Sequence, residues 1–138
     1  MDMPLSNITV LEASRILSGP FCTMLLADLG ARVLKVEKPW RGDIARNIGP
    51  NVGDDSAYFV SVNRGKKSLA IDIFTQPGQD LFRRLSKQVD VVVENYIPGT
   101  MANLGLDYKK LKMGNPGLIY ASISGFGQNG PYARRPAL

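Results

Sequence analysis

The stretch LSGPFCTMLLADLGARVLKVEKP, residues 17–39, decides the fold, because a turn, a helix, a second turn and a strand follow one another in it. Gly19-Pro20 opens the predicted helix, since proline is tolerated in the first helical turn. Residues 21–29 are apolar nearly all round, which predicts a largely buried helix. Gly30 stands where a left-handed glycine commonly ends a helix, and residues 33–36 then form a buried strand.

Strands and helices continue to alternate along the chain. Strands are predicted at residues 8–11, 68–73, 89–94 and 118–124, and helices, with Thr75 and Asp107 as N-caps, at 75–88 and 107–113. Residues 12–15 and 38–55 are interpreted as loops, and residues 58–62 as either a short helix or a strand. Apolar strands between helices predict an α/β fold, a Rossmann-like parallel sheet with helices on both faces and ligands at the carboxyl ends of the strands.

The composition limits the classes of protein. The 138 residues are 44% hydrophobic and 21% charged, as in one globular domain with a modest core. Histidine is absent, which excludes histidine bases and serine–histidine triads within this chain, and no metal site is expected. The single cysteine, Cys22, is interpreted as a core residue. With no membrane-spanning run and no secretory signal at the start, we expect a cytoplasmic protein.

The charge balance favours an anionic partner. Seventeen Lys and Arg stand against 12 Asp and Glu, which gives a net charge of +5. A nucleic acid and a phosphorylated small molecule both fit this charge, but the cations are scattered over predicted loops, which favours a compact phosphate ligand. These cations are Lys38, Arg41, Arg46, Arg64, Lys66, Lys67, Arg134 and Arg135. For any single one, a solvated basic surface is the alternative.

Three segments at predicted strand ends are candidates for ligand binding. The Ser18–Pro20 turn places a helix N-terminus there, which favours an anion, although Gly19 would also serve a plain tight turn. Tyr96 offers a ring for stacking on a base, or is simply a half-buried turn residue. Residues 125–130 match G-x-G-x-x-G, but no apolar helix follows, so we interpret them as a glycine-rich loop and reject a dinucleotide fingerprint.

Taken together, these segments resemble the class III CoA-transferases, the family that contains formyl-CoA transferase, the carnitine CoA-transferases and α-methylacyl-CoA racemase. The resemblance covers nearly the whole chain, in order and with the spacing kept. It is carried by GPFCTMLLADLGARVLKVEKP from Gly19, GD at 42–43 with Arg46, NRGKKSLAIDI from Asn63, DVVVENYIPG from Asp90 and YASISGFGQNGPYARRP from Tyr120.

The resemblance implies a Rossmann-like large domain and a small domain, in a homodimer whose two chains are interlocked like linked rings. It implies coenzyme A, as acyl-CoA, and a small carboxylate as substrates, with neither nucleic acid nor a membrane as partner. In the implied mechanism an aspartate attacks the acyl-CoA, and an anhydride and then a CoA thioester form on the enzyme. Carried over by position, the family's CoA contacts fall at Ile16, Leu17, Ser18, Lys38, Ile71 near the adenine, Asn95 and Tyr96.

The sequence departs from the family at several positions. Leu17 stands where the transferases often have a glutamine, and Asn103 where some members have a basic residue that helps to hold the phosphates. Leu138 stands where the racemases have a histidine, which disfavours the alternative of an acyl-CoA racemase.

The family's nucleophilic aspartate matches a position beyond Leu138. We therefore expect residues 1–138 to be the N-terminal part of the CoA-binding large domain, without a catalytic residue of their own, without the small domain and the C-terminal segment, and without turnover alone. We also expect exposed apolar surface that makes the chain self-associate or leaves it marginally stable. A CoA- or nucleotide-binding module without chemistry is the alternative.

Overall fold

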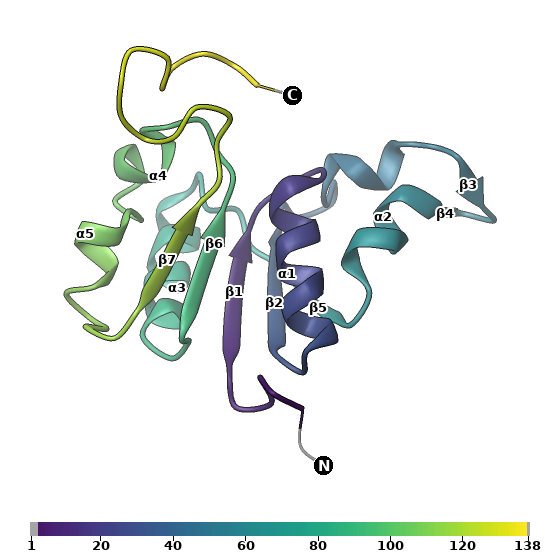
Figure 1. The fold of residues 1–138 in the computed structure, drawn as a ribbon, viewed down its shortest axis with the longest axis horizontal. Helices are drawn as coiled ribbons and strands as arrows, with labels where there is room; N and C mark the ends of the chain where they lie inside the picture. Colours follow the sequence, from purple (N-terminus) through teal and green to yellow (C-terminus); the bar gives the residue numbers. More distant parts are fainter. Residues whose placement is uncertain (1–2, 138) are drawn as a thin grey trace.

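A five-stranded sheet with all strands parallel organises the computed structural model, which describes residues 3–137 (Figure 1). The strand order is β5-β2-β1-β6-β7. The strands are β1 (Thr9–Ala13), β2 (Arg32–Glu37), β5 (Lys66–Ala70), β6 (Val91–Glu94) and β7 (Ile119–Ser122). The central strand β1 pairs with β2 on one side and with β6 on the other, so that Val10 is opposite both Val33 and Val91. The predicted α/β fold class is confirmed.

Helices cover both faces of this sheet (Figure 1). One face carries α1 (Ser18–Asp28), against which α2 (Ala57–Asn63) packs, and the other carries α3 (Gln76–Ser86), α4 (Thr100–Asn103) and α5 (Tyr108–Leu111). The larger apolar core lies under α3 and includes Phe82, Leu11 and Val92, each fully buried. A smaller core joins Val10 and neighbouring strand residues to the inner side of α1. The apolar strands are therefore buried from both sides, as parallel sheets require.

The segment between β2 and α2 is more structured than predicted. It contains the 3₁₀ helix η1 (Ile44–Asn47) and a small antiparallel hairpin of β3 (Asn51–Val52) and β4 (Asp55–Ser56). The ambiguous residues 58–62 belong to helix α2, whose N-cap is Ser56. The N-caps Thr75 and Asp107 are confirmed, since their side chains accept hydrogen bonds from the backbone N–H groups of Gly78 and Lys110.

Several strand boundaries differ from the sequence prediction, and those of β1 and β5 have a clear physical reason. Glu12 and Ala13 were expected in a loop, but they continue β1, because Ala13 still pairs with Glu94 of β6. Strand β5 ends at Ala70, whereas the prediction extended it to Ile73. Ile71 and Ile73 instead leave the sheet edge and pack into the larger core. The short helix α4 has no counterpart in the prediction.

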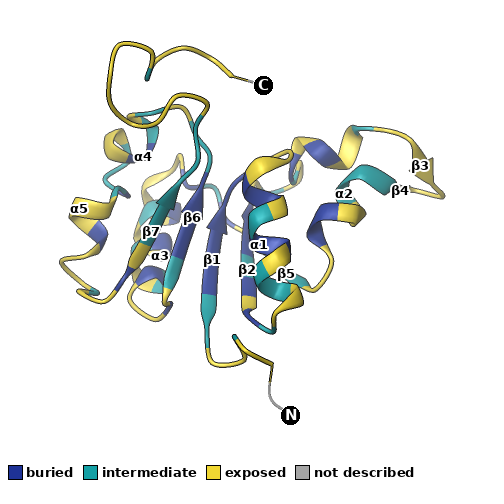
Figure 2. Cartoon of the chain, viewed as in Figure 1, coloured by how far each residue is buried: buried dark blue, intermediate teal, exposed yellow. Residues whose placement is uncertain are grey.

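Helix α1 is only partly buried, which corrects the prediction (Figure 2). Its inner side, with Pro20 and Met24, packs on the sheet, whereas Phe21, Leu25 and Leu29 are 48%, 46% and 46% exposed. Cys22 is likewise partly exposed rather than a core residue. Apolar residues on every side of a helix do not identify what covers its outer side. In the described residues, the outer side of α1 stays about half exposed.

Gly30 ends α1 as predicted, with a φ of 101° that side chains rarely adopt. Within residues 3–137, no helix is both long and apolar enough to cross a membrane.

Candidate functional site

The sheet changes winding direction beside β1, and this places the candidate site. Helix α1 connects β1 to β2 on one face, while α3 connects β5 to β6 on the other. In open parallel sheets the crevice for a ligand lies outside the carboxyl ends of the two strands at such a point. Here these are β1 and β6. The segment Arg15–Ser18, called the first loop below, follows β1, and Asn95 and Tyr96 follow β6.

Asn95 holds the first loop from the β6 side. Its Oδ1 accepts a hydrogen bond from the backbone N–H of Arg15 at 2.8 Å. Its Nδ2 donates to the carbonyl oxygen of Arg15 at 2.7 Å and to Oγ of Ser18 at 3.2 Å. Both amide hydrogens are therefore used within the protein. Asn95 was expected to contact CoA, and the structure places it beside the first loop, where its hydrogen bonds are with Arg15 and Ser18.

Asp43 holds the same loop from the β2 side. Its Oδ1 accepts hydrogen bonds from the backbone N–H of Ile16 at 3.1 Å and of Ala45 at 3.0 Å. Ile16 has a φ of 69°, in the left-handed region that a β-branched residue rarely occupies. The first loop thus has a conformation that its own residues do not favour, and it is held by side chains from the segments that follow β2 and β6.

A cluster of four buried charged side chains lies beneath the first loop, and we call it the ion cluster: Glu12, Lys35, Asp43 and Lys66. Nζ of Lys35 is 2.9 Å from Oε1 of Glu12 and 2.9 Å from Oδ2 of Asp43. Nζ of Lys66 is 3.0 Å from Oε2 of Glu12. Two positive and two negative side chains balance. No side chain in the cluster is more than 2% exposed, so each depends on its partners.

The cluster shifts the pKa values of Glu12 and Lys66. Burial alone raises the pKa of the Glu12 carboxyl, but the ammonium groups of Lys35 and Lys66 and the hydroxyl of Thr23 outweigh it, and the pKa is lowered. Burial lowers the pKa of Lys66 to about 8, against the opposing attraction of Glu12. The hydroxyl of Thr23 on α1 donates to Oε2 of Glu12 at 2.7 Å, which ties this helix to the cluster.

Sequence reasoning missed the ion cluster. Glu12 was placed in a loop, and Lys66 was counted among scattered loop cations, whereas both are buried against each other. The available signal was a charged residue inside each of two apolar strands, TVLEA and RVLKVE. Glu12 and Lys35 are direct partners in the register of β1 and β2.

Two cavities flank the first loop and share Arg15 in their walls. The basic cavity, of about 260 Å³, lies towards β2 and is lined by Arg15, Lys38, Arg41, Phe74 and Tyr96, among others. The loop cavity, of about 580 Å³, lies on the other side and is lined by Ile16, Leu17, Ser18, Tyr58, Asn95 and Ser124, among others. Of the seven predicted contacts, six therefore line these two cavities.

Ile71 is the exception among the predicted contacts. It is 7% exposed and belongs to the larger core. Conversely, Arg15, Arg41, Phe74 and Tyr58 line the cavities without having been predicted as contacts. The glycine-rich loop reaches the loop cavity only through Gly125. Leu138, which bears on the racemase alternative, lies outside the described residues.

The basic cavity combines cations with aromatic rings. The guanidinium of Arg15 lies 5.0 Å from the ring centre of Tyr96, and Phe74 meets Tyr96 edge to face at 6.0 Å. Burial raises the pKa of Tyr96. Nζ of Lys38 has a carboxylate neighbour, Asp72, at 3.8 Å and is largely exposed. Such a wall suits a ligand with phosphates and a planar ring.

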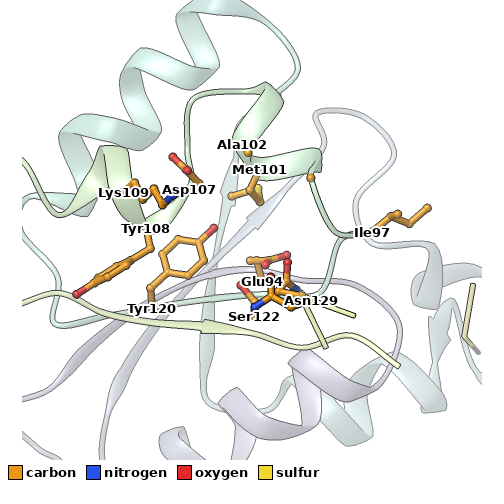
Figure 3. A pocket seen from close by; sticks show the side chains of 12 residues that line it. Glu94, Ile97, Met101, Ala102, Asp107, Tyr108, Lys109, Tyr120, Ser122 and Asn129 are labelled. Carbon is orange, nitrogen blue, oxygen red and sulfur yellow. The ribbon is translucent and has the colours of Figure 1, made fainter. Parts of the chain in front are cut away.

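A third cavity, of about 530 Å³, lies beside β6 and β7 (Figure 3). Its wall contains Glu94, Asp107, Lys109, Tyr120 and Ser122, among others. Burial raises the pKa of Glu94 and of Tyr120, whose hydroxyl donates to the carbonyl oxygen of Leu106 at 3.1 Å. With two carboxyl groups and one ammonium group in the wall, this cavity is less suited to an anion than the basic cavity.

Known proteins resemble this chain in sequence over nearly its whole length. The family model for CoA-transferase family III matches residues 5–138. The acetyl-CoA:oxalate CoA-transferase of Acetobacter aceti is 46% identical over 134 residues, covering 97% of this chain and 34% of that protein. The human succinyl-CoA:glutarate CoA-transferase is 47% identical over 133 residues, covering 96% and 30%.

A solved structure resembles this chain in both fold and sequence. A CAIB/BAIF family protein from Brucella suis is 48% identical, with a TM-score of 0.92 over 99% of this chain and 37% of that one. The chain spans about a third of the length of the curated relatives that it matches.

The environment of Glu37 predicts a defined pH dependence of stability. Burial raises the pKa of its carboxyl, but hydrogen bonds from Arg46, Ser68 and the backbone N–H of Asp43 outweigh it and lower the pKa from 4.5 to about 2. As the pH falls, the unfolded chain therefore binds this proton before the folded one does. The stabilisation is fully present above pH 4.5 and is lost as the pH falls to about 2.

Urea unfolding at a series of pH values measures this effect. We expect the free energy of unfolding of the wild type to fall more steeply between pH 4.5 and pH 2 than that of a Glu37→Gln variant. Asp80→Asn removes an exposed carboxylate on α3 and controls for the loss of one charge. Parallel curves for the wild type and Glu37→Gln would contradict the role given to Glu37.

Proposed function

The chain belongs to CoA-transferase family III, and on this premise we propose that it forms part of the coenzyme A site of an enzyme that moves CoA from an acyl-CoA donor to a carboxylate acceptor. The observation that carries the proposal is the basic cavity beside a fixed loop at the carboxyl ends of β1 and β2. Coenzyme A has the matching chemistry, with phosphates and an adenine at one end and a thiol on a narrow chain at the other.

In the proposed pose, Lys38, Arg41 and Arg15 bind the phosphates, and the adenine lies near Tyr96 and Phe74. The pantetheine chain runs along Ile16, Leu17 and Ser18 towards the loop cavity. Ile71, the expected adenine neighbour, acts from the core beneath this region, where its N–H donates to the carbonyl oxygen of Glu37 at 2.9 Å. Asn95 does not contact the ligand in this pose but holds the first loop through its hydrogen bonds to the backbone of Arg15.

The proposed reaction uses an aspartate as nucleophile. Its carboxylate adds to the thioester carbonyl, the carbon–sulfur bond breaks, and CoA leaves as a thiolate while an anhydride forms. The thiolate then attacks the aspartyl carbonyl of the anhydride, which releases the donor's carboxylate and leaves an aspartyl-CoA thioester. The acceptor carboxylate then attacks the aspartyl-CoA thioester, which releases the CoA thiolate and forms a second anhydride. The thiolate attacks the acceptor's carbonyl of this anhydride, which gives the new acyl-CoA and frees the aspartate. Among residues 3–137, no carboxylate lines the loop cavity. We propose that these residues bind and orient the substrate.

The wider assignments follow the family. We propose that residues 1–138 are the N-terminal part of the CoA-binding large domain, that the parent enzyme is a cytoplasmic interlocked homodimer, and that the chain alone does not turn over. Two relatives are named for oxalate and glutarate as acceptors. We therefore propose a small dicarboxylate as the acceptor class.

Calorimetric titration with coenzyme A tests the binding site. We expect the purified chain to bind CoA and Lys38→Ala to weaken binding about tenfold, the loss of one phosphate contact of roughly 1.4 kcal/mol. Lys109→Ala removes the same charge from the third cavity and is the matched control, with unchanged affinity. Equal losses in the two variants, or CoA displaced by DNA, would contradict the proposed site.

The transfer reaction is measured on the same chain with acetyl-CoA and oxalate and with succinyl-CoA and glutarate. We expect binding without transfer. Clear turnover would show that the chain carries its own nucleophile.

The half-exposed outer side of α1 supports self-association. Phe21, Leu25 and Leu29 form an apolar row on it. We expect light scattering after gel filtration to give a mass above 15.1 kDa for the wild type and a lower mass for Leu25→Lys. A uniform monomer of the wild type with a high melting temperature would contradict this expectation.

A further inference from the structure

The first loop needs a support that its own sequence does not provide. Ile16 is β-branched and has a φ of 69°, so its isolated backbone would leave this conformation. Its side chain is 42% exposed and forms part of the wall of the loop cavity, so packing alone does not fix the residue. The restraint must act on the backbone, and the backbone N–H of Ile16 donates to Asp43 at 3.1 Å.

Asp43 is itself fixed on every side. Its Oδ1 accepts from the N–H groups of Ile16 and Ala45, and its own N–H donates to Oε1 of Glu37 at 2.9 Å. Its Oδ2 lies 2.9 Å from Nζ of Lys35 as an ion pair and has no hydrogen-bond partner among the described residues. The residue is 2% exposed. The two hydrogen bonds to Oδ1 and the ion pair of Oδ2 with Lys35 together hold the carboxylate in one orientation.

The ion cluster makes this orientation insensitive to the ligand. Lys35 is opposite Glu12 in the register of β1 and β2, so the strand pairing determines where its ammonium group lies. Because Lys35 neutralises Asp43, the carboxylate can lie in the wall of a cavity for an anion without repelling it. Asp43 is thus suited to act on the loop rather than on a phosphate.

We propose that Asp43 is a positioning residue, which acts through the backbone N–H of Ile16 to hold the first loop ready for coenzyme A. The loop is held between the two neighbours of β1, by Asp43 from the segment after β2 and by Asn95 from the end of β6. A loop ordered in advance removes the entropic cost of ordering it on binding. The identity of the ligand rests on the proposed function, whereas the restraint on Ile16 does not.

The test uses the 138-residue chain and two readouts, the dissociation constant for coenzyme A and the hydrogen exchange rate of the Ile16 amide by NMR. Asp43→Ala removes the acceptor, and we expect at least tenfold weaker CoA binding and at least tenfold faster exchange at Ile16. Asp43→Asn keeps an oxygen acceptor without the charge, but its amide nitrogen would then meet the ammonium group of Lys35. We therefore expect only partial rescue, with both readouts between those of Asp43→Ala and the wild type.

A matched control separates positioning from general stability. Nδ2 of Asn115 also donates to two carbonyl oxygens, of Ser86 at the end of α3 and of Val89 before β6, at 3.0 and 2.8 Å. Asn115 lies before β7, at the amino ends of the strands. We expect Asn115→Ala to lower the melting temperature and to leave CoA affinity and Ile16 exchange unchanged.

The outcomes distinguish the inference from the proposed function. Wild-type exchange at Ile16 in Asp43→Ala would overturn the inference, and so would wild-type CoA affinity in that variant. If Asp43→Ala does not fold, Asp43→Asn decides, because faster exchange at Ile16 together with wild-type CoA affinity would show that the hold on Ile16 does not serve binding. If the wild-type chain binds no CoA, the proposed function fails, and the exchange rates alone still support or overturn the restraint by Asp43.

Discussion

The structure depends on one constraint, the pairing of four charged side chains in a place that water does not reach. Burying charges is costly unless geometry and hydrogen bonds are good, and removing one partner of a buried pair typically costs about 3–5 kcal/mol. Here Lys35 of β2 pairs with Glu12 of β1 and with Asp43 of the segment after β2, and Lys66 of β5 pairs with Glu12. The cluster thereby fixes three strands and the base of the first loop relative to one another.

The candidate site follows from this constraint and from the topology. Because β1 lies between β2 and β6, side chains that follow these two neighbours reach the loop after β1 from both sides. Asp43 and Asn95 use these positions, and the loop then separates the basic cavity from the loop cavity. Lys38 and Arg41 line the basic cavity on one side of the first loop. On the other side, the described residues that line the loop cavity include no carboxylate. This division matches a ligand with phosphates at one end and a reactive thioester at the other.

The sequence predicted the fold well because apolar strands, caps and turn glycines are local signals, as Thr75, Asp107 and Gly30 show. It did not predict the ion cluster, because Glu12 and Lys35 meet only through strand register and Lys66 only through the order of strands. The burial of α1 was overestimated, since apolar residues on all sides do not identify what covers the outer one. The resemblance pointed to six residues that line the cavities. It did not predict whether each side chain faces the cavity or, as with Asn95, is bonded to the first loop.

A crystal structure of the chain with bound coenzyme A would show how the ligand lies on the first loop. We expect phosphates on Lys38 and Arg41 in the basic cavity, the pantetheine chain along Ile16–Ser18, and the Asp43 and Asn95 hydrogen bonds to the first loop unchanged. Coenzyme A bound in the third cavity, beside Glu94 and Tyr120, would contradict the proposed site. Loss of the hydrogen bond between Ile16 and Asp43 on ligand binding would contradict the role of Asp43.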